Sequence, residues 1–428
     1  MTADHTAQDT PLCDYMAGLG ARARAASSQL SRLGETERTR GLNAMASAVD
    51  AARGEILRAN AVDMQLGQQK GLDAALMDRL ALDDKRVDAI AAGLRTVAGL
   101  DDPIGRELAR WTRPNGLDIA RIACPLGVIG IIYESRPNVT ADAAALCLRS
   151  GNAAILRCGS ESLNSSTAIA AAMRDALAGE GLPADAIQLV ETNDRAAVGH
   201  MLAGLDGQMD VVVPRGGRGL VSRVQDEARI PVIGHLEGIC HAYVDASADP
   251  QTAIDVVFNA KMRRPGICGA LETLLVDRSV AADLLPAIAR PLLEAGCELR
   301  GDDAARAHLP GMAPASEADW HTEHLAPVLG VRVVDGLEGA MEHIRTFSSG
   351  HTDSVIAEDQ AVCERFLAEI DSAIVMANAS TQFADGGEFG MGAEIGIATG
   401  RIHARGPVGA EQLTIFKYVV RGTGQTRP

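Results

Sequence analysis

The spacing of hydrophobic residues along the chain changes near residue 100. Between residues 12 and 100, apolar side chains recur three or four positions apart among Ala, Arg, Glu and Gln, as at Leu30, Leu33, Leu42, Met45 and Val49. This is the period of an α-helix with one buried face. We therefore expect several helices here, with no strand between them.

From Leu126 onward, short apolar runs alternate with segments of helical length. The expected strands are Gly127–Tyr133, Ala153–Arg157, Ile187–Glu191, Met209–Pro214 and Ile230–Gly234. The expected helices are Ala141–Arg149, Ser165–Ala178, Arg195–Leu205 and Leu220–Ala228. Runs such as Val-Ile-Gly-Ile-Ile are apolar at every position, which is typical of parallel strands covered on both faces. The alternation predicts a doubly wound α/β domain.

A second α/β set begins near Ala246. Asp249 and Pro250 are a typical helix start, with a capping carboxylate and a proline at the first helical position. Strands are expected at Glu272–Asp277, Val328–Val334, Asp353–Ala357 and Ala373–Ala377. The stretch Ser380–Gly400 is too glycine-rich for a regular element, and we expect a loop that lines a site.

Two further strands stand apart from these sets. Leu117–Ala123 alternates apolar and polar residues, which predicts a strand of a hairpin or an edge ribbon. Leu413–Val420 is strongly apolar and is followed only by a polar tail. An isolated strand needs a partner edge, so we expect these two strands to pair, within one chain or between subunits.

Composition and charge exclude several classes of protein. The 428 residues are 47% hydrophobic and 22% charged, which indicates a globular chain with two or three domains. A net charge of −16 argues against nucleic acid or an anionic membrane as the main partner. The first ten residues show no secretory signal, and no apolar run approaches the length of a membrane span. Eight cysteines without a CxxC pair favour free thiols in a reducing cytoplasm, with neither a zinc site nor a disulfide framework.

One cysteine, Cys268, is placed like a nucleophile. Pro265 and Gly266 end the preceding helix, and Gly269 keeps space open beside the sulfur. The basic residues just before it, Lys261, Arg263 and Arg264, could favour the reactive thiolate. A free cysteine is more often a small buried hydrophobic residue, and the surrounding turn raises Cys268 above that default.

Polar residues follow the first two strands of the α/β domain, where ligands of open parallel sheets gather. Asn138 could donate an N–H to an oxyanion and Arg136 could meet a phosphate or carboxylate. Alternatively, Asn138 only caps a helix and Arg136 is a surface charge. This segment alone favours neither interpretation. Arg157, with the serines that open the next helix, suits a nucleotide ribose or its 2′-phosphate.

Two glycine-containing segments complete the candidate chemistry. No GxGxxG motif follows the first strand, so any nucleotide is bound in a non-standard manner. Pro214-Arg-Gly-Gly-Arg-Gly219 is a tight turn that lets backbone approach a cofactor, and a single copy in an acidic chain gives the RNA-binding interpretation little weight. The segment His235–His241 contains two histidines, Glu237 and Cys240. Its spacing matches no common zinc pattern, which favours a structural cluster at a strand end, with Glu237 near the site.

These segments together resemble the aldehyde dehydrogenase superfamily and, most closely, its γ-glutamyl phosphate reductase branch. The strings that match this branch are Tyr-Glu-Ser-Arg-Pro-Asn-Val-Thr, Gly-Ile-Cys-His, His-Thr-Asp-Ser and Phe-Gly-Met-Gly-Ala-Glu-Ile-Gly. The match covers nearly everything from Pro125 to the C-terminus, whereas the N-terminal helices match mainly in length and character.

The resemblance implies two doubly wound α/β domains and a small β oligomerisation flap. Residues 1–115 and 125–245 would form the nucleotide-binding domain, residues 246–400 the catalytic domain, and residues 116–124 and 401–428 the oligomerisation strands. It also implies a cytoplasmic homo-oligomer, a dimer or tetramer, with glutamate 5-kinase as a candidate partner.

The implied activity is that of an NADP-dependent, phosphorylating glutamate-5-semialdehyde dehydrogenase of proline biosynthesis. Cys268 would displace phosphate from L-glutamyl 5-phosphate, and NADPH would reduce the resulting thioester to L-glutamate 5-semialdehyde. The Asn138 amide and the N–H of Cys268 would hold the oxyanion. The implied cofactor contacts are Arg157, Gly159, Ser160, Pro214, Arg215, Gly216, Gly217 and Gly238. The implied substrate contacts are Arg136, Asn378, Ser380 and Thr381, and no metal is implied.

Two comparisons with the pattern of the family leave alternative functions open. Many relatives have asparagine directly after the cysteine, where this chain has Gly269. Glu237 stands where hydrolytic aldehyde dehydrogenases keep a general base, so an ordinary aldehyde-oxidising enzyme is the alternative activity. An inactive relative that serves as a scaffold is the alternative of a different class, and the joint presence of Cys268 and Asn138 argues against it. The choice of NADPH over NADH depends on Arg157 and on the resemblance.

Overall fold

The computed structural model describes residues 10–427, which form two compact units. The first unit runs to Gly234 and includes Gly390–Gly396 and the chain from Val408. The second comprises His235–Phe389 and Ile397–Pro407. The resemblance puts the domain boundary at residue 245, but the second unit begins at His235, because the strand at 240–244 pairs in the second sheet. The expectation about a secretory signal falls largely on residues 1–9, outside the described residues.

The N-terminal segment is entirely helical, as the spacing of apolar residues predicts. Its helices are α1 (Thr10–Leu30), α2 (Glu35–Ala51), α3 (Arg53–Gln69), α4 (Ala74–Leu80) and α5 (Asp84–Ala98). Leu42, Met45 and Val49 are fully buried on α2. Helices α2 and α3 pack against α7, and α5 packs against α6, so this segment covers the first sheet instead of forming a separate domain.

The sheet of the first unit has four parallel strands in the order β5-β4-β3-β6. The strands are β3 (Val128–Tyr133), β4 (Ala153–Arg157), β5 (Ile187–Leu189) and β6 (Val211–Arg215). Helices α6 (Val139–Arg149), α7 (Leu163–Gly179), α8 (Ala196–Leu202) and α9 (Arg218–Glu227) connect or follow them. The expected strand Ile230–Gly234 is wrong, because only Val232 makes a single bridge, to Val212.

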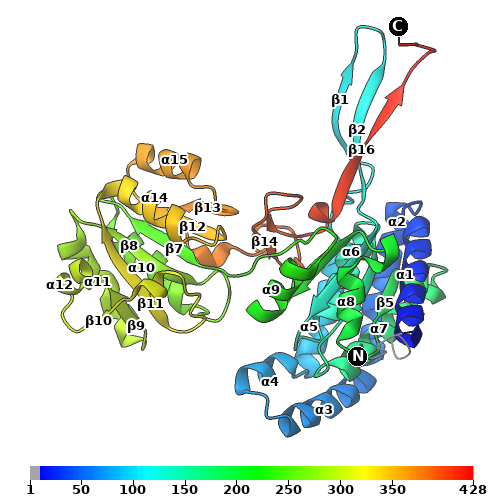
Figure 1. Ribbon diagram of the computed structural model, residues 1–428, viewed down its shortest axis with the longest axis horizontal. Helices are drawn as coiled ribbons and strands as arrows, with labels where there is room; N and C mark the ends of the chain where they lie inside the picture. The colour runs from blue at the N-terminus through cyan, green and yellow to red at the C-terminus, as the bar shows by residue number, and fades with distance from the viewer. Residues whose placement is uncertain (1–9, 428) are drawn as a thin grey trace, which may run out of the picture. The chain divides into compact units, whose positions relative to one another are not determined.

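A three-stranded antiparallel ribbon extends from the first unit (Figure 1). It comprises β1 (Glu107–Thr112), β2 (Asp118–Pro125) and β16 (Thr414–Arg421). The expected pairing of the two isolated strands is confirmed within one chain, since β16 pairs with β2 along its whole length. The strand β1 was not expected, because its sequence Glu-Leu-Ala-Arg-Trp-Thr is largely exposed and alternates poorly.

The second unit contains seven parallel strands in the order β10-β9-β11-β8-β7-β12-β13. These are β7 (Cys240–Val244), β8 (Leu271–Asp277), β9 (Glu298–Gly301), β10 (Ala313–Pro314), β11 (Val328–Val334), β12 (Thr352–Ile356) and β13 (Ile374–Ala377). A separate antiparallel pair, β14 (Ile397–Ala398) and β15 (Gly406–Pro407), lies in the segment between β13 and the C-terminal strand β16.

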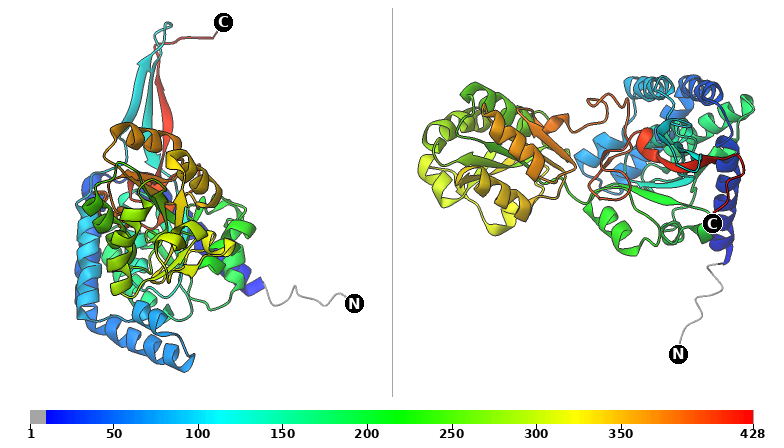
Figure 2. Two further views of the ribbon diagram at one scale, coloured as in Figure 1. Left: turned by 90° about the vertical axis from the view of Figure 1, so that its left-hand side faces the viewer. Right: turned by 90° about the horizontal axis from the view of Figure 1, so that it is seen from above.

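Helices cover both faces of this sheet, as Figures 1 and 2 show. Along β7, Ala242 and Val244 pack with α10 (Pro250–Met262) and α11 (Ala281–Glu294), whereas Tyr243 packs with α14 (Gly336–Phe347) and α15 (Gln360–Glu369). The two short helices are α12 (Asp303–His308) and α13 (Glu317–Trp320). The main sheet of each unit is therefore parallel, and the predicted α/β class is confirmed.

Candidate active site

Cys268 lies in the turn between α10 and β8, as the sequence predicts. The α-helix ends at Met262, and the N–H of Ala270 donates to the carbonyl oxygen of Ile267 at 2.9 Å to close the turn. The Cys268 side chain is half-buried, whereas the other cysteines of the second unit, 240, 297 and 363, are buried. Cys268 is thus the accessible thiol of this unit.

Two glycines, Gly238 and Gly269, permit close backbone packing around the Cys268 turn. A Cβ at Gly238 would lie 2.1 Å from the carbonyl oxygen of Cys268, so a side chain there would displace the turn. A Cβ at Gly269 would lie 3.0 Å from the carbonyl oxygen of Thr381. The segment before β7 and the loop after β13 therefore hold the Cys268 turn between them.

Two of the three basic residues before Cys268, Lys261 and Arg263, have other partners. Lys261 is fully buried, and its Nζ donates to Glu272 at 2.7 Å. Arg263 donates to the side-chain oxygen of Gln382 at 3.3 Å. The hypothesis that Lys261 and Arg263 activate the thiol loses support, because their side chains bind to neighbouring elements.

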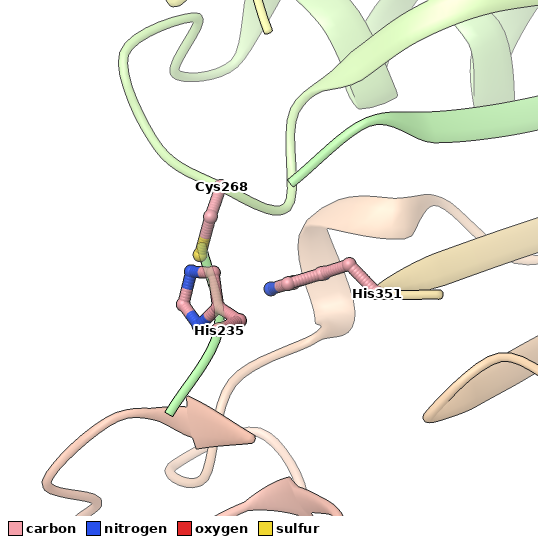
Figure 3. Close-up of side chains that lie close together, drawn as sticks. All are labelled: His235, Cys268 and His351. Atoms are coloured by element: carbon pink, nitrogen blue, oxygen red, sulfur yellow. The ribbon is translucent and has the colours of Figure 1, made fainter. Parts of the chain in front are cut away.

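Two histidines, His235 and His351, lie beside the sulfur of Cys268 (Figure 3). One ligand atom of each of the three side chains lies within 4.8 Å of the other two. The histidine rings meet edge to face, with centroids 4.8 Å apart. His351 is fully buried and His235 is half-buried. Sequence reasoning did not single out this group, because its members come from three separate segments.

The string His-Thr-Asp-Ser, residues 351–354, places His351 directly before β12. Asp353 accepts two hydrogen bonds from His241, one from its backbone N–H at 3.0 Å and one from its ring Nδ1–H at 2.8 Å. Ser354 donates to the carbonyl oxygen of Ala379 at 2.8 Å. The string thus joins β12 to β7 and to the loop that packs against Gly269, which keeps His351 in position.

Hydrogen bonds from the backbone N–H groups of Gly238 and Ile239 hold the segment before β7. The Gly238 N–H donates to Glu323 at 3.0 Å, and the Ile239 N–H donates to Ser349 at 2.9 Å. The Cys240 thiol donates to the carbonyl oxygen of Cys268 at 3.1 Å, and burial raises the pKa of that thiol well above its usual value. Cys240 is therefore a neutral structural donor.

The loop after β13 contains three of the four predicted substrate contacts, Asn378, Ser380 and Thr381. The Asn378 amide accepts from the Ala357 N–H at 2.9 Å and donates to the Ala357 carbonyl at 2.8 Å, which supports its positive φ of 53°. Ser380 accepts from the N–H of Gln382 at 3.2 Å. The buried Thr381 hydroxyl has no hydrogen-bond partner among the described residues. Contacts of these three residues with substrate stay predictions.

In the first unit, Asn138 begins α6, and its amide nitrogen donates to Asp142 at 2.8 Å. Burial raises the pKa of Asp142 to about 6, although Asn138 and Arg215 oppose that rise. One amide N–H of Asn138 is thus used, and the second remains for another acceptor. Sequence reasoning missed Asp142, and its position four residues after Asn138 was the available signal. The half-buried Arg136 lies in the same turn, between β3 and α6.

The turn after β4 brings together several of the predicted cofactor contacts. Arg157 is buried, donates to the carbonyl oxygen of Cys158, and keeps an Nε without a partner among the described residues. Glu161 accepts from both the N–H and the hydroxyl of Ser135 at 2.8 Å. Lys70, at the end of α3, donates to the Ser160 hydroxyl at 3.4 Å and was not expected at this site.

The turn after β6 leaves no room for a side chain at its first glycine. A Cβ at Gly216 would lie 2.3 Å from a carboxylate oxygen of Glu134, and the Gly217 N–H donates to the same carboxylate at 2.8 Å. The start of α9 therefore already binds a negative group. Cofactor contacts at Pro214, Arg215, Gly216 and Gly217 stay predictions, as does that at Gly238 in the second unit.

Comparisons with known proteins place these features in a family. The model described as "Aldehyde dehydrogenase family" matches residues 17–297. The chain is 66% identical over 428 residues to γ-glutamyl phosphate reductase of Hyphomonas neptunium, with 100% of both covered. It is 59% identical over 413 residues to that of Caulobacter vibrioides, covering 96% of this chain and 100% of the relative. The crystal structure of the Thermotoga maritima γ-glutamyl phosphate reductase matches at a TM-score of 0.95 and 44% identity, covering 96% and 100% of the two chains.

The chain therefore belongs to the aldehyde dehydrogenase family. Within it, the chain belongs to the γ-glutamyl phosphate reductases. The resemblance found in the sequence is confirmed. Among residues 10–427, no helix is both long and apolar enough to cross a membrane.

Proposed function

We propose that the chain reduces L-glutamyl 5-phosphate to L-glutamate 5-semialdehyde and inorganic phosphate, with NADPH as the reductant, in proline biosynthesis. The observation that supports this most directly is the half-buried thiol of Cys268 in a glycine-flanked turn. Membership of the γ-glutamyl phosphate reductases supports the choice of substrate.

Cys268 is the proposed nucleophile. Its thiolate attacks the acyl carbon of the acyl phosphate, the carbon–oxygen bond to phosphate breaks, and a thioester forms on the sulfur. Phosphate leaves with the electron pair of that bond, so no strong acid is needed to expel it. A thiolate is both a good nucleophile and a good leaving group, which suits it to the later release of the aldehyde.

Asn138 is the proposed donor to the oxyanion, together with the backbone N–H of Cys268. The contact with Asp142 supports this role, because it holds the amide nitrogen in a single orientation. Arg136, Asn378, Ser380 and Thr381 are the proposed contacts of the glutamate head group and the phosphate. Of these, Thr381 has a buried hydroxyl without a partner among the described residues, which suits a ligand contact.

The residues after β4 fit a nicotinamide dinucleotide. Arg157 offers a buried Nε that has no hydrogen-bond partner within residues 10–427, and Lys70 adds a positive charge beside the Ser160 hydroxyl. A 2′-phosphate is the group that such a pair of cations would favour. Carboxylates at Glu134 and Glu161 suit ribose hydroxyls instead. When bound, NADPH supplies the hydride that reduces the acyl carbon.

The remaining proposals concern the setting of the enzyme. We propose that it acts in the cytoplasm and that it forms a homo-oligomer. The oligomer is supported by the ribbon of β1, β2 and β16, which exposes aromatic residues. A complex with glutamate 5-kinase would protect the labile acyl phosphate in transit.

The reaction run in reverse tests this proposal. L-Glutamate 5-semialdehyde and NADP⁺ are mixed with the enzyme, with and without inorganic phosphate, and NADPH absorbance is followed. Steady turnover that requires phosphate, and that falls by at least about 10³-fold in Cys268→Ser, is the expected result. The matched control Cys124→Ser changes another half-buried thiol and should keep full activity.

Two other outcomes would replace the proposal. Steady turnover without phosphate, lost in Glu237→Gln, would identify an ordinary aldehyde-oxidising enzyme with Glu237 as the general base. A folded protein that binds NADP⁺ but turns over no semialdehyde would identify an inactive relative.

A further inference from the structure

Three side chains in the second unit bring together the ligand types that zinc prefers. One atom each of His235, Cys268 and His351 lies within 4.8 Å of the other two. The residues come from the segment before β7, the turn before β8 and the residue before β12. Figure 3 shows the sulfur next to the His235 ring, with His351 approaching from the side.

The His235 ring has one nitrogen held by the backbone. Its Nδ1 lies 2.6 Å from the carbonyl oxygen of Ile397. A carbonyl only accepts, so Nδ1 carries the proton and Nε2 keeps its lone pair. A backbone carbonyl behind the ring is the usual support of a histidine that binds a metal.

The His351 ring offers a buried nitrogen that receives no hydrogen bond from the part of the chain that the structure describes. Its Nδ1 lies 2.9 Å from the Thr352 hydroxyl and 3.7 Å from the Cys240 sulfur. Its Nε2 is buried and has no hydrogen-bond partner among the described residues, on a residue with 0% exposure. Figure 3 shows a nitrogen at the far end of this ring directed toward His235. An unsatisfied buried polar atom is unfavourable, and coordination of an ion would satisfy it.

We propose that His235, Cys268 and His351 form a reversible binding site for one Zn²⁺ ion. Two imidazoles and a thiolate are ligands that Zn²⁺ accepts, with water in the fourth position. On binding, the sulfur forms a bond to zinc and the thiol proton passes to solvent. The ligand atoms of a tetrahedral site stand roughly 3.5 Å apart, so these side chains must close by about 1 Å. His235 and Cys268 are half-buried in loops, which allows that movement and makes the site weaker than a preformed structural one.

The proposed set of zinc ligands differs from the cluster of residues 235–241 that the sequence analysis considered as a metal site. Of the clustered residues 235–241, only His235 contributes. His241 is bound to Asp353, and the Cys240 thiol donates to the backbone of Cys268. The other two ligands are distant in sequence, so no spacing pattern could have indicated them.

Zinc at this position would inhibit the enzyme. Coordination uses the sulfur electron pair that attacks the acyl group, so the nucleophile is blocked until the metal leaves. This consequence depends on the proposed function, whereas metal binding itself does not.

Cobalt binding tests the site without reference to activity. The full-length protein is stripped with EDTA and titrated with Co²⁺, whose tetrahedral thiolate complexes absorb in the visible and show a sulfur-to-metal band in the near ultraviolet. We expect one Co²⁺ per chain with both features, displaced by Zn²⁺. Cys268→Ser should abolish the sulfur band. His235→Ala and His351→Ala should each weaken Zn²⁺ binding by at least about 10- to 100-fold, the loss seen when even a group behind a ligand is removed.

Matched controls separate this site from adventitious binding. Cys124→Ser removes a thiol of the same burial, and His308→Ala removes a half-buried histidine of the same unit. Both should bind as the wild type does. Unchanged affinity in Cys268→Ser, or an equal loss in the controls, would overturn the site. If His351→Ala fails to fold by circular dichroism, His235→Ala decides.

Enzyme assays then test the inhibition. Zn²⁺ should lower activity with the affinity found by displacement of Co²⁺, and EDTA should restore it. An enzyme that loses activity in EDTA alone would show that the metal assists catalysis, against this proposal. A chain with the predicted cobalt spectrum but no activity would contradict the proposed function and leave the zinc site standing.

Discussion

The carboxylate of Asp142 holds the amide of Asn138 by one of its two N–H groups. Burial raises the pKa of Asp142 to about 6, with Asn138 and the positive charge of Arg215 opposing the rise. Below that pH the carboxyl gains a proton and can donate to the amide oxygen instead, which favours the flipped amide. At the residue scale, the orientation of the proposed oxyanion donor is therefore linked to one titrating group.

This link predicts an acid limb in the pH dependence of kcat/KM. Activity should fall as pH drops through about 6, because protonated Asp142 no longer orients the amide. Asp142→Asn, which cannot ionise, should remove that limb. Asp142→Ala should lower kcat by about 10- to 100-fold at neutral pH through misplacement of the amide. An acid limb that survives in Asp142→Asn would contradict this role.

Lys70 is the second residue whose role follows from position. Its Nζ lies 3.4 Å from the Ser160 hydroxyl, at the turn where the 2′-phosphate of NADPH is proposed to bind. A charged hydrogen bond to phosphate is worth about 1.5–3 kcal/mol. Lys70→Ala should therefore reduce kcat/KM for NADPH by about tenfold or more and leave that for NADH unchanged. Lys85→Ala, another exposed lysine, is the control, and an equal loss with both cofactors would exclude this role.

At the scale of elements, a buried ion pair joins α10 to β8 across the Cys268 turn. Lys261 and Glu272 are 2.7 Å apart, with exposures of 0% and 1%. Burial raises the pKa of Glu272 to about 7, although Lys261 opposes the rise. A raised carboxyl pKa means that the folded state binds more protons than the unfolded one, so this group's contribution to stability falls as pH rises.

Lys261→Ala should consequently destabilise the fold in a pH-dependent manner. An unpaired buried carboxylate costs about 3–5 kcal/mol, and protonation of Glu272 relieves that cost. Urea unfolding should show a larger loss at about pH 8 than at about pH 6. The double variant Lys261→Met, Glu272→Gln should recover much of the stability. A loss that is independent of pH would show that packing, and not charge, is what Lys261 supplies.

The same scale shows which elements a sequence can reveal. Strands β4 and β11 were predicted at their observed bounds, because they are apolar runs between turn residues. Strand β7 was missed, because Cys-His-Ala-Tyr-Val contains a buried histidine whose partner, Asp353, lies 112 residues away. The candidate site also combines residues that the sequence indicates with residues that it does not. The turn of Cys268 is local and was recognised, whereas His351 and Lys70 reach the proposed sites through tertiary contacts.

At the scale of the whole molecule, the ribbon exposes an apolar face. Trp111 and Tyr418 meet edge to face at 6.2 Å, and Phe416 lies 5.6 Å from Tyr418. Tyr418 and Val420 are 59% and 53% exposed, on the same side of β16. An exposed cluster of this kind is typical of an association surface.

The double variant Tyr418→Asp, Val420→Asp should therefore dissociate the proposed oligomer. Two carboxylates on this face would have to be buried in the interface without partners. Size-exclusion chromatography with light scattering should give the mass of one chain. Lys417→Asp alters an exposed residue on the opposite side of the strand and should leave the mass unchanged. An oligomer that persists in the double variant would place the interface elsewhere.

The central claim is that the acyl group is held on Cys268 and that phosphate releases it. The most direct measurement mixes enzyme, NADP⁺ and L-glutamate 5-semialdehyde without phosphate, then adds phosphate. We predict a burst of about one NADPH per chain, an acyl adduct on the Cys268 peptide by mass spectrometry, and continued turnover only after phosphate is added. Continuous turnover before phosphate, or an acyl group on any other residue, would contradict the account.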